Sequence, residues 1–230
     1  AVMAATPRTS LNGSLKRACA SYNCTSCAAL AGVETAAIAA WAWGFHRAVD
    51  ALVQMPVLDA QAIAVVGHSR GGKAALLAGA LDERIALTCA NNSGAGGAGS
   101  FHCLGPGAES LSDIVEAFPH WLSAGLQDFK GRTQALAFDQ HFLKALVAPR
   151  YLLTTQAMDD LWANPEGTVA THQAASQVYE WLGAASRLVL AFRPGGHPQN
   201  AWDWQTLLAH MDVCFKGLQP PVHELPAGLL

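Results

Sequence analysis

Apolar residues recur at helical or strand spacing along most of the chain, and the two spacings alternate. Between residues 33 and 55 the apolar positions follow the period of a helix, which Pro56 then ends. Residues 62–66 form a short apolar run suited to a buried strand, residues 73–81 are helical, and residues 84–90 have the composition of a second strand. The pattern therefore predicts a strand, a tight turn, a helix and another strand in direct succession.

The second half of the chain continues this alternation after a long loop rich in glycine and serine. Residues 150–156 and 186–192 are predicted strands, and residues 166–183 and 201–218 are predicted helices. Strands that alternate with helices pair in parallel, so we expect an α/β fold with a mostly parallel sheet between two layers of helices.

The start of the chain is the part that fits this scheme least. The first 32 residues contain no convincing strand, although a sheet of this type normally begins with strands ahead of the long helix. We therefore expect N-terminal strands to be missing or aberrant. The predicted organisation is an irregular segment over residues 1–32, a single α/β domain over residues 33–218 and a tail over residues 219–230, because 230 residues, half of them apolar, suit one core.

Composition excludes several classes of partner. The formal net charge is −3 without a cluster of lysines or arginines, which argues against nucleic acid. No apolar run reaches eighteen residues, so we expect no membrane span, and the first residues lack the order of a signal peptide. Cys24 and Cys27 form a Cys-x-x-Cys pair just after Cys19, but neither a second pair nor a nearby histidine completes a zinc pattern, so we expect no metal site.

The turn after the first buried strand carries the clearest chemical motif. The sequence from Gly67 to Gly71 fits Gly-x-Ser-x-Gly, the nucleophile elbow that holds a serine hydroxyl clear of a sheet. Ser69 could instead simply cap the following helix. A phosphate-binding loop is excluded because Ala74 follows Lys73 where that motif needs Ser or Thr. Strand, elbow and helix together favour a nucleophile.

A serine nucleophile needs a histidine base and an acid, which α/β-hydrolases supply in the order Ser, Asp or Glu, His. Asp159 and Asp160 follow one predicted strand and His197 follows the next, so all lie at the edge where sites of open α/β sheets form. Either aspartate could be a helix cap and His197 a loop residue. Their order behind Ser69 favours a catalytic triad.

The sequence also resembles a known family. The segment from Gly67 to Lys73 is similar to the Gly-Cys/His-Ser-Arg-x-Gly-Lys signature of the glucuronoyl esterases, carbohydrate esterases with the α/β-hydrolase fold. Further similar segments occur in family order, namely AWAWGFHRAVDAL, ALDERIALTCANNSGAGGAG, FPHW, FDQHFLKALVAPR, MDDLWANPEG and GGH. The resemblance implies hydrolysis of esters between 4-O-methyl-glucuronic acid on xylan and a lignin alcohol, without a metal or cofactor. It also implies a secreted or periplasmic enzyme, and we expect a monomer.

The resemblance assigns roles to the residues of the elbow. Ser69 would attack the uronate carbonyl, His197 would take and return its proton, Arg70 would stabilise the oxyanion, and Lys73 would bind sugar hydroxyls. Fungal members carry a glutamate acid where this chain has Asn92. Some bacterial members place the acid before a Leu-Trp pair, which favours Asp160 here.

Two points of the assignment stay open. Alignment with other α/β-hydrolases favours Asp159 as the acid instead of Asp160. Trp162 would form a wall against the sugar unless it is a core aromatic, and Glu116 resembles the glutamate that binds the sugar, with Glu109 a weaker candidate. An esterase for acetyl or aryl esters, and a non-catalytic carbohydrate-binding relic, are the alternative functions.

Overall fold

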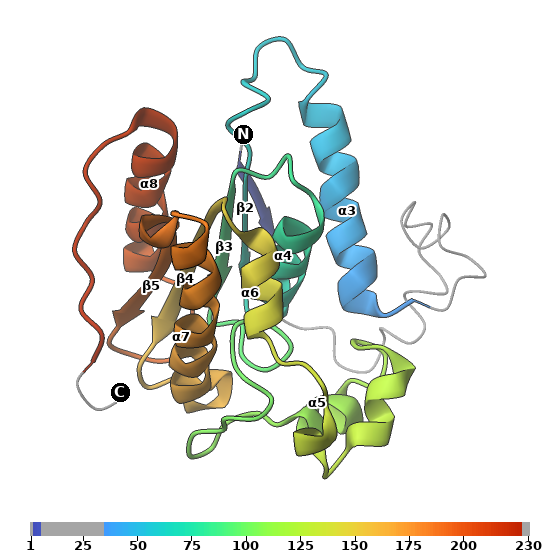
Figure 1. The fold of residues 1–230 in the computed structure, drawn as a ribbon. Coiled ribbons are helices and arrows are strands. Elements are labelled where there is room, and N and C mark those ends of the chain that lie inside the picture. Colours follow the sequence, from blue (N-terminus) through green and yellow to red (C-terminus); the bar gives the residue numbers. More distant parts are fainter. Residues whose placement is uncertain (1, 6–34, 227–230) are drawn as a thin grey trace.

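A five-stranded parallel sheet forms the centre of the molecule (Figure 1). The computed structural model describes residues 2–5 and 35–226. The strands lie in the order of the chain, and they are β1 (Val2–Ala5), β2 (Ala64–His68), β3 (Leu87–Asn91), β4 (Tyr151–Ala157) and β5 (Leu188–Arg193). The prediction of an α/β fold with a parallel sheet is confirmed.

Helices cover both faces of this sheet, which makes three layers (Figure 1). One face carries α3 (Ala37–Leu52), α4 (Arg70–Leu81), α6 (His141–Val147) and α7 (Pro165–Trp181), and the other carries α8 (Ala201–Lys216). Alternation along β2 explains the arrangement: Ala64 and Val66 pack in the cluster that contains Leu207 of α8, whereas Val65 packs with Val49 of α3. The sheet is thus buried between two helical layers.

Shorter elements complete the fold below the sheet. They are α5 (Leu111–Ala117) and the 3₁₀ turns η1 (Ala124–Phe129), η2 (Thr133–Ala135) and η3 (Leu161–Ala163). A further 3₁₀ turn, η4 (Ala185–Arg187), directly precedes β5 at the other end of the strands. A separate apolar cluster packs α5 against the start of α3 and includes Ile38, Leu111, Ile114 and Trp121. This small lobe covers one side of the edge where the strands end.

The N-terminal strand corrects one expectation. The pattern predicts no strand before residue 33, yet β1 pairs in parallel with β2, with Val2 opposite Ala64. Its four residues, VMAA, contain a single β-branched side chain, and a run this short carries too little periodicity to be detected. The rest of the predicted irregular segment, with Cys19, Cys24 and Cys27, lies outside the described residues.

All strands point the same way, so their carboxyl ends meet at one edge of the sheet. Ser69 follows β2, Asn92 follows β3, Asp160 lies beyond β4 and His197 lies beyond β5. Parallel pairing therefore gathers four polar side chains that are far apart in the sequence.

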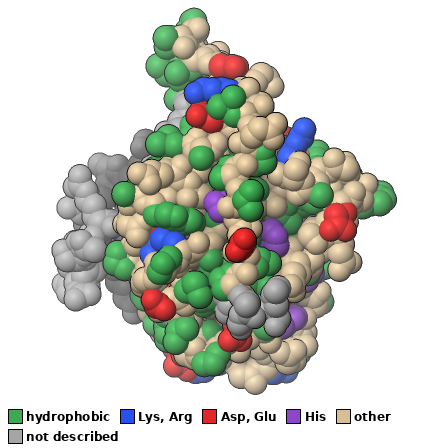
Figure 2. Space-filling view, turned by 90° about the vertical axis from the view of Figure 1, so that its left-hand side faces the viewer, with side chains coloured by type: hydrophobic (Ala, Val, Ile, Leu, Met, Phe, Trp, Pro, Cys, Tyr) green, Lys and Arg blue, Asp and Glu red, His purple; other side chains and the backbone are tan. Residues whose placement is uncertain are grey.

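Figure 2 shows the face of the molecule that carries α8 and the C-terminal tail, with a carboxylate and histidines near its centre among hydrophobic side chains.

Over residues 2–5 and 35–226, no helix is both long enough and apolar enough to cross a membrane.

Candidate active site

The turn between β2 and α4 holds Ser69 in a backbone conformation that residues other than glycine rarely adopt. Its φ is 56° and its ψ is −126°. A side chain at Gly67 would meet the carbonyl oxygen of Gly71 at 2.0 Å, so only glycine lets this turn close. Ser69 occupies the N-cap position of α4, but its side chain makes no capping hydrogen bond. The geometry is that of an elbow, and it argues against Ser69 as a simple helix cap.

Ser69 lines a cavity of about 390 Å³ at the carboxyl-terminal edge of the sheet. We call this cavity the elbow pocket. Most of the side chains singled out from the sequence line it together: Ser69, Arg70, Lys73, Glu109, Asp160, Trp162 and His197. The other lining residues are Asn92, Ser93, Gly94, Phe118, Trp121 and Ala163.

His197 and Asp160 meet inside this pocket. The Nδ1 atom of His197 lies 2.6 Å from Oδ2 of Asp160, which is hydrogen-bonding distance. The Asp160 side chain is 5 % exposed, whereas that of His197 is 43 % exposed. A buried carboxylate on Nδ1 favours the tautomer that leaves Nε2 unprotonated and able to accept a proton. The neighbouring Asp159 is exposed and instead accepts a hydrogen bond from the backbone N–H of Gly195 at 3.0 Å.

The loop that carries His197 is held at several points by side chains from other elements. Arg193, at the end of β5, donates to the carbonyl oxygens of Pro194 at 3.1 Å and Pro198 at 2.7 Å. Its Nε bonds both carboxylate oxygens of Asp203 on α8 at 2.9 Å. Both side chains are buried. The guanidinium therefore clamps both ends of the loop, in the fork geometry that arginine provides and lysine does not.

Asn92 adds another support to this loop. Its Nδ2 donates to the carbonyl oxygen of His197 at 2.9 Å, and its Oδ1 accepts from the N–H of Ala157 at 2.7 Å. The amide therefore links the end of β4 to the histidine loop. A carboxylate could not donate the bond to His197, so the amide gives Asn92 a defined structural task in this loop.

His68 packs its ring against His197, with ring centroids 4.6 Å apart. Its Nδ1 lies 2.5 Å from Oδ1 of Asn91, whose Nδ2 donates to Thr155 and Asp203. The Asn91 oxygen must therefore accept, which gives His68 a proton on Nδ1. Burial lowers the pKa of His68 below its ordinary value, so the ring is neutral at pH 7 and adds no positive charge beside His197.

Lys73 lies deep in the elbow pocket with its ammonium group fully bonded. Nζ donates to the carbonyl oxygens of Ser93 at 2.8 Å and Ala95 at 2.5 Å, and it lies 3.2 Å from Oε2 of Glu109. Burial lowers the pKa of Lys73 below the ordinary value, and Glu109 opposes this shift. Arg70, by contrast, has no hydrogen-bond or ion-pair partner among the described residues and lines the same cavity. It is therefore the cation available to negative charge that develops in this cavity.

The structure favours Glu109 over Glu116 as the glutamate of the elbow pocket. The resemblance favours Glu116 as the sugar-binding glutamate, but Glu116 forms an ion pair with Lys130, its side chain is 58 % exposed, and it does not line the elbow pocket. Glu109 lines the pocket and bonds Lys73. The capping box at Ser110 starts α5 between the two and turns Glu116 toward solvent.

Trp162 lies at the mouth of the pocket. It is 54 % exposed, so it is not the core aromatic that was the alternative interpretation. Its backbone carbonyl accepts from the N–H of Glu109 at 3.0 Å, which ties this wall to the Lys73–Glu109 pair.

Comparison of the chain with known proteins identifies its family. The family model described as glucuronyl esterase, fungi, matches residues 30–183 of the chain. The chain belongs to the glucuronyl esterase family. Among curated relatives, a carbohydrate esterase from an unknown prokaryotic organism is 38 % identical over 191 residues, covering 76 % of this chain and 44 % of the relative. The 4-O-methyl-glucuronoyl methylesterase 1 of Phanerochaete chrysosporium is 37 % identical, covering 74 % of this chain and 38 % of that protein.

Solved structures of glucuronoyl esterases have the same fold as this chain. A carbohydrate esterase family 15 glucuronoyl esterase from Caldicellulosiruptor kristjansonii superposes with a TM-score of 0.79 at 40 % identity, covering 83 % of this chain and 53 % of that one. A mutant glucuronoyl esterase from Sporotrichum thermophile, in complex with methyl 4-O-methyl-β-D-glucopyranuronate, gives a TM-score of 0.74 at 27 % identity, covering 82 % and 54 %. The α/β-hydrolase fold is thereby confirmed. This glucuronyl esterase chain spans less than half the length of the curated relatives it matches.

Some residues of this glucuronyl esterase site have no signal in the sequence analysis. Arg193 and Asp203 act through buried contacts between distant elements, and no local motif marks the contact between them. The Asn200-x-x-Asp203 spacing is a capping-box pattern, and it would have located Asp203 at the start of α8. It would not have found the bond to Arg193.

Proposed function

We propose that the chain carries a serine esterase site for esters of 4-O-methyl-glucuronic acid, with Ser69 as nucleophile, His197 as base and Asp160 as the acid that orients it. The observation that carries this proposal is the 2.6 Å contact of His197 with Asp160 in the pocket lined by the Ser69 elbow. Family membership supports the ester and sugar classes, since the related proteins are named for 4-O-methyl-glucuronoyl methyl esters.

In the proposed reaction, the Ser69 hydroxyl oxygen attacks the ester carbonyl while Nε2 of His197 takes its proton. The buried Asp160 carboxylate stabilises the imidazolium that forms. The tetrahedral intermediate then collapses, and His197 returns the proton to the leaving alcohol. Water repeats the sequence on the acyl-enzyme and releases the uronic acid.

Negative charge develops on the carbonyl oxygen during this attack, and Arg70 is the group proposed to stabilise it. Its side chain lines the pocket immediately after the nucleophile and lacks a protein partner among the described residues. Loss of a single well-placed oxyanion donor typically costs about 3 kcal/mol of transition-state stabilisation.

Lys73, Glu109 and Trp162 are proposed to hold the sugar ring. Lys73 and Glu109 form one buried pair in the pocket wall. Since the Lys73 ammonium already has three partners, a sugar hydroxyl would replace one of them or donate to the Glu109 carboxylate. The half-exposed indole of Trp162 provides an apolar surface for a ring face. A secreted or periplasmic location and a monomeric state stay predictions from the family resemblance.

The test is a comparison of substrates. We expect a higher kcat/KM for methyl 4-O-methyl-glucuronate than for methyl galacturonate, and the lowest values for acetyl and aryl esters. Equal or faster turnover of acetyl esters would assign the site to another substrate class. Binding of glucuronoxylan without hydrolysis of any ester would support the relic instead.

A further inference from the structure

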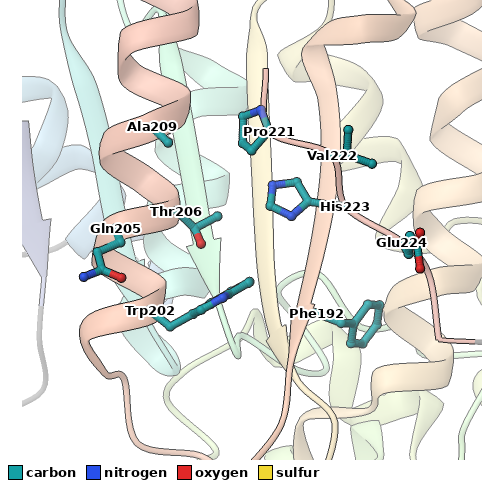
Figure 3. A pocket seen from close by; sticks show the side chains of 9 residues that line it. All are labelled: Phe192, Trp202, Gln205, Thr206, Ala209, Pro221, Val222, His223 and Glu224. Carbon is teal, nitrogen blue, oxygen red and sulfur yellow. The ribbon is translucent and has the colours of Figure 1, made fainter. Parts of the chain in front are cut away.

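A second cavity lies on the face of the sheet that α8 covers, between α8 and the tail that follows it. Its volume is about 420 Å³, which is close to that of the elbow pocket and within the usual range of ligand sites. We call it the α8 pocket. It is lined by Phe192, Trp202, Gln205, Thr206, Ala209, Pro221, Val222, His223 and Glu224 (Figure 3). None of these residues belongs to the proposed esterase site.

The tail wall of this pocket is anchored by contacts with α8 and the sheet. Nε2 of His223 lies 2.9 Å from Nε2 of His210 on α8, and Nδ1 of His210 lies 2.9 Å from the hydroxyl of Tyr151 on β4. The ring of His223 also meets Trp202 in an edge-to-face arrangement at 6.3 Å. The cavity is therefore bounded by tertiary contacts on both sides.

Polar groups in the α8 pocket lack partners. Thr206 is 7 % exposed, and Figure 3 shows its hydroxyl on the side of α8 that faces His223. Within the described part of the chain, neither this hydroxyl, the Trp202 indole N–H nor the Glu224 carboxylate has a hydrogen-bond partner. The Thr206 side chain is largely buried, but its hydroxyl borders the cavity and has no partner among the described residues, so it is available to a ligand there.

The chemistry of these groups suits a neutral sugar. Each sugar hydroxyl both donates and accepts, and the pocket offers a donor in Trp202, an acceptor in Glu224 and a group of both kinds in Thr206. The indole supplies an apolar surface for a ring face. Burial lowers the pKa of His223, so Glu224 is the charged side chain of this lining, and it disfavours an anionic sugar such as a uronate.

We propose that the α8 pocket is a second saccharide site, which binds a neutral pyranose unit. The two pockets adjoin along the chain, because His197 lines one and Trp202, five residues later, lines the other. Five residues span at most about 18 Å, so an oligosaccharide of a few units can reach from one pocket to the other. This last consequence, that one polysaccharide engages both, rests on the proposed function.

The test is an NMR titration of the ¹⁵N-labelled chain with xylotetraose, which is neutral and contains no ester. We expect saturable shifts of the Trp202 indole N–H signal. The Trp202→Ala variant should weaken binding at least about tenfold, and Thr206→Val, which keeps the side-chain shape, should weaken it about fivefold. Trp181→Ala is the matched control, since Trp181 lies on α7, is 83 % exposed and does not line the pocket; its Kd should stay within twofold of wild type.

Competition separates this proposal from the esterase proposal. Saturating methyl glucuronate should leave the Kd for xylotetraose unchanged. Displacement by methyl glucuronate, an unchanged Kd in Thr206→Val, or tighter binding of a simple amine such as butylamine at Trp202 would each overturn a neutral-sugar site. Circular dichroism checks the fold of each variant, and if Trp202→Ala unfolds, Thr206→Val decides. An inactive esterase would leave this titration interpretable, because it measures binding alone.

Discussion

The elbow pocket and the α8 pocket have similar volumes but opposite polarity. The elbow pocket contains an unpaired cation, Arg70, with its carboxylates already bonded to Lys73 and His197. Among the described residues that line it, the α8 pocket has a carboxylate without a partner, Glu224, and neither a lysine nor an arginine. Because the two volumes are similar, cavity size alone does not indicate which ligand each pocket binds. The charged side chains without a partner among the described residues distinguish the two pockets: Arg70 can stabilise the oxyanion that forms when an ester is attacked, whereas Glu224 disfavours an anionic sugar and leaves a neutral one.

The two pockets also differ in how their walls are built. The elbow pocket lies where strands end. Hydrogen bonds from Asn92, just after β3, and from Arg193 of β5 hold its histidine loop, and Asp203 of α8 holds Arg193. The α8 pocket has one wall on a helix and the other on the tail, which His223 anchors. Catalysis needs the more rigid arrangement, because small displacements of a base cost rate.

The largest expected effect is that of Ser69→Ala. Removal of the nucleophile should lower kcat/KM for methyl glucuronate by about 10⁴-fold or more, while the Kd for xylotetraose stays within twofold. Steady-state kinetics and the NMR titration measure the two quantities on the same protein. Retained hydrolysis would mean that another residue is the nucleophile. Loss of both hydrolysis and xylotetraose binding would mean that the two ligands share one site.

The second largest expected effect is a loss of kcat that distinguishes the roles of Asp160 and Asp159. Asp160→Asn should lower kcat by about a thousandfold, because an amide neither holds the productive tautomer of His197 nor stabilises its charged form. Asp159→Asn should lower kcat less than about tenfold, since Asp159 contacts only the backbone of Gly195 in this loop. The reverse order of the two losses would make Asp159 the acid.

A smaller effect is expected from the clamp on the histidine loop. Arg193→Lys should lower kcat about 10- to 100-fold with little change in KM, because one ammonium cannot bond both ends of the loop and Asp203. Arg84→Lys is the matched control, since Arg84 makes a similar fork with Asp82 away from either pocket. Equal losses of kcat in both variants would mean a general loss of stability.

The smallest predicted effect is a pH dependence that only the elbow pocket should show. The lowered pKa of Lys73 means that it loses its proton at a lower pH than an ordinary lysine, so KM for methyl glucuronate should rise about tenfold with increasing pH. The Lys73→Arg variant should abolish this rise. His223 is neutral above its lowered pKa, so the Kd for xylotetraose should stay constant from about pH 7 to pH 10. A parallel rise in that Kd would contradict the different polarity of the pockets.

The elbow and the order of the candidate triad could be predicted because each depends on near neighbours. Gly67 marks a turn that other residues would not let close, and strand patterns locate Asp160 and His197 just beyond strand ends. The choice between Glu109 and Glu116 could not be made this way. Glu109 lies just before α5 and Glu116 near its end, and only the direction of that short helix decides which one meets Lys73.

By itself, the sequence determined the alternation of strands and helices, the parallel sheet and the position of the elbow, because backbone geometry follows from local spacing and glycine placement. The tertiary structure decided the partner of each buried charge: Asp160 for His197, Glu109 for Lys73 and Asp203 for Arg193. It also formed the α8 pocket by bringing the tail against α8. Such pairings depend on how elements far apart in the chain pack together, and the cost of leaving a buried charge unpaired enforces them only after that packing exists.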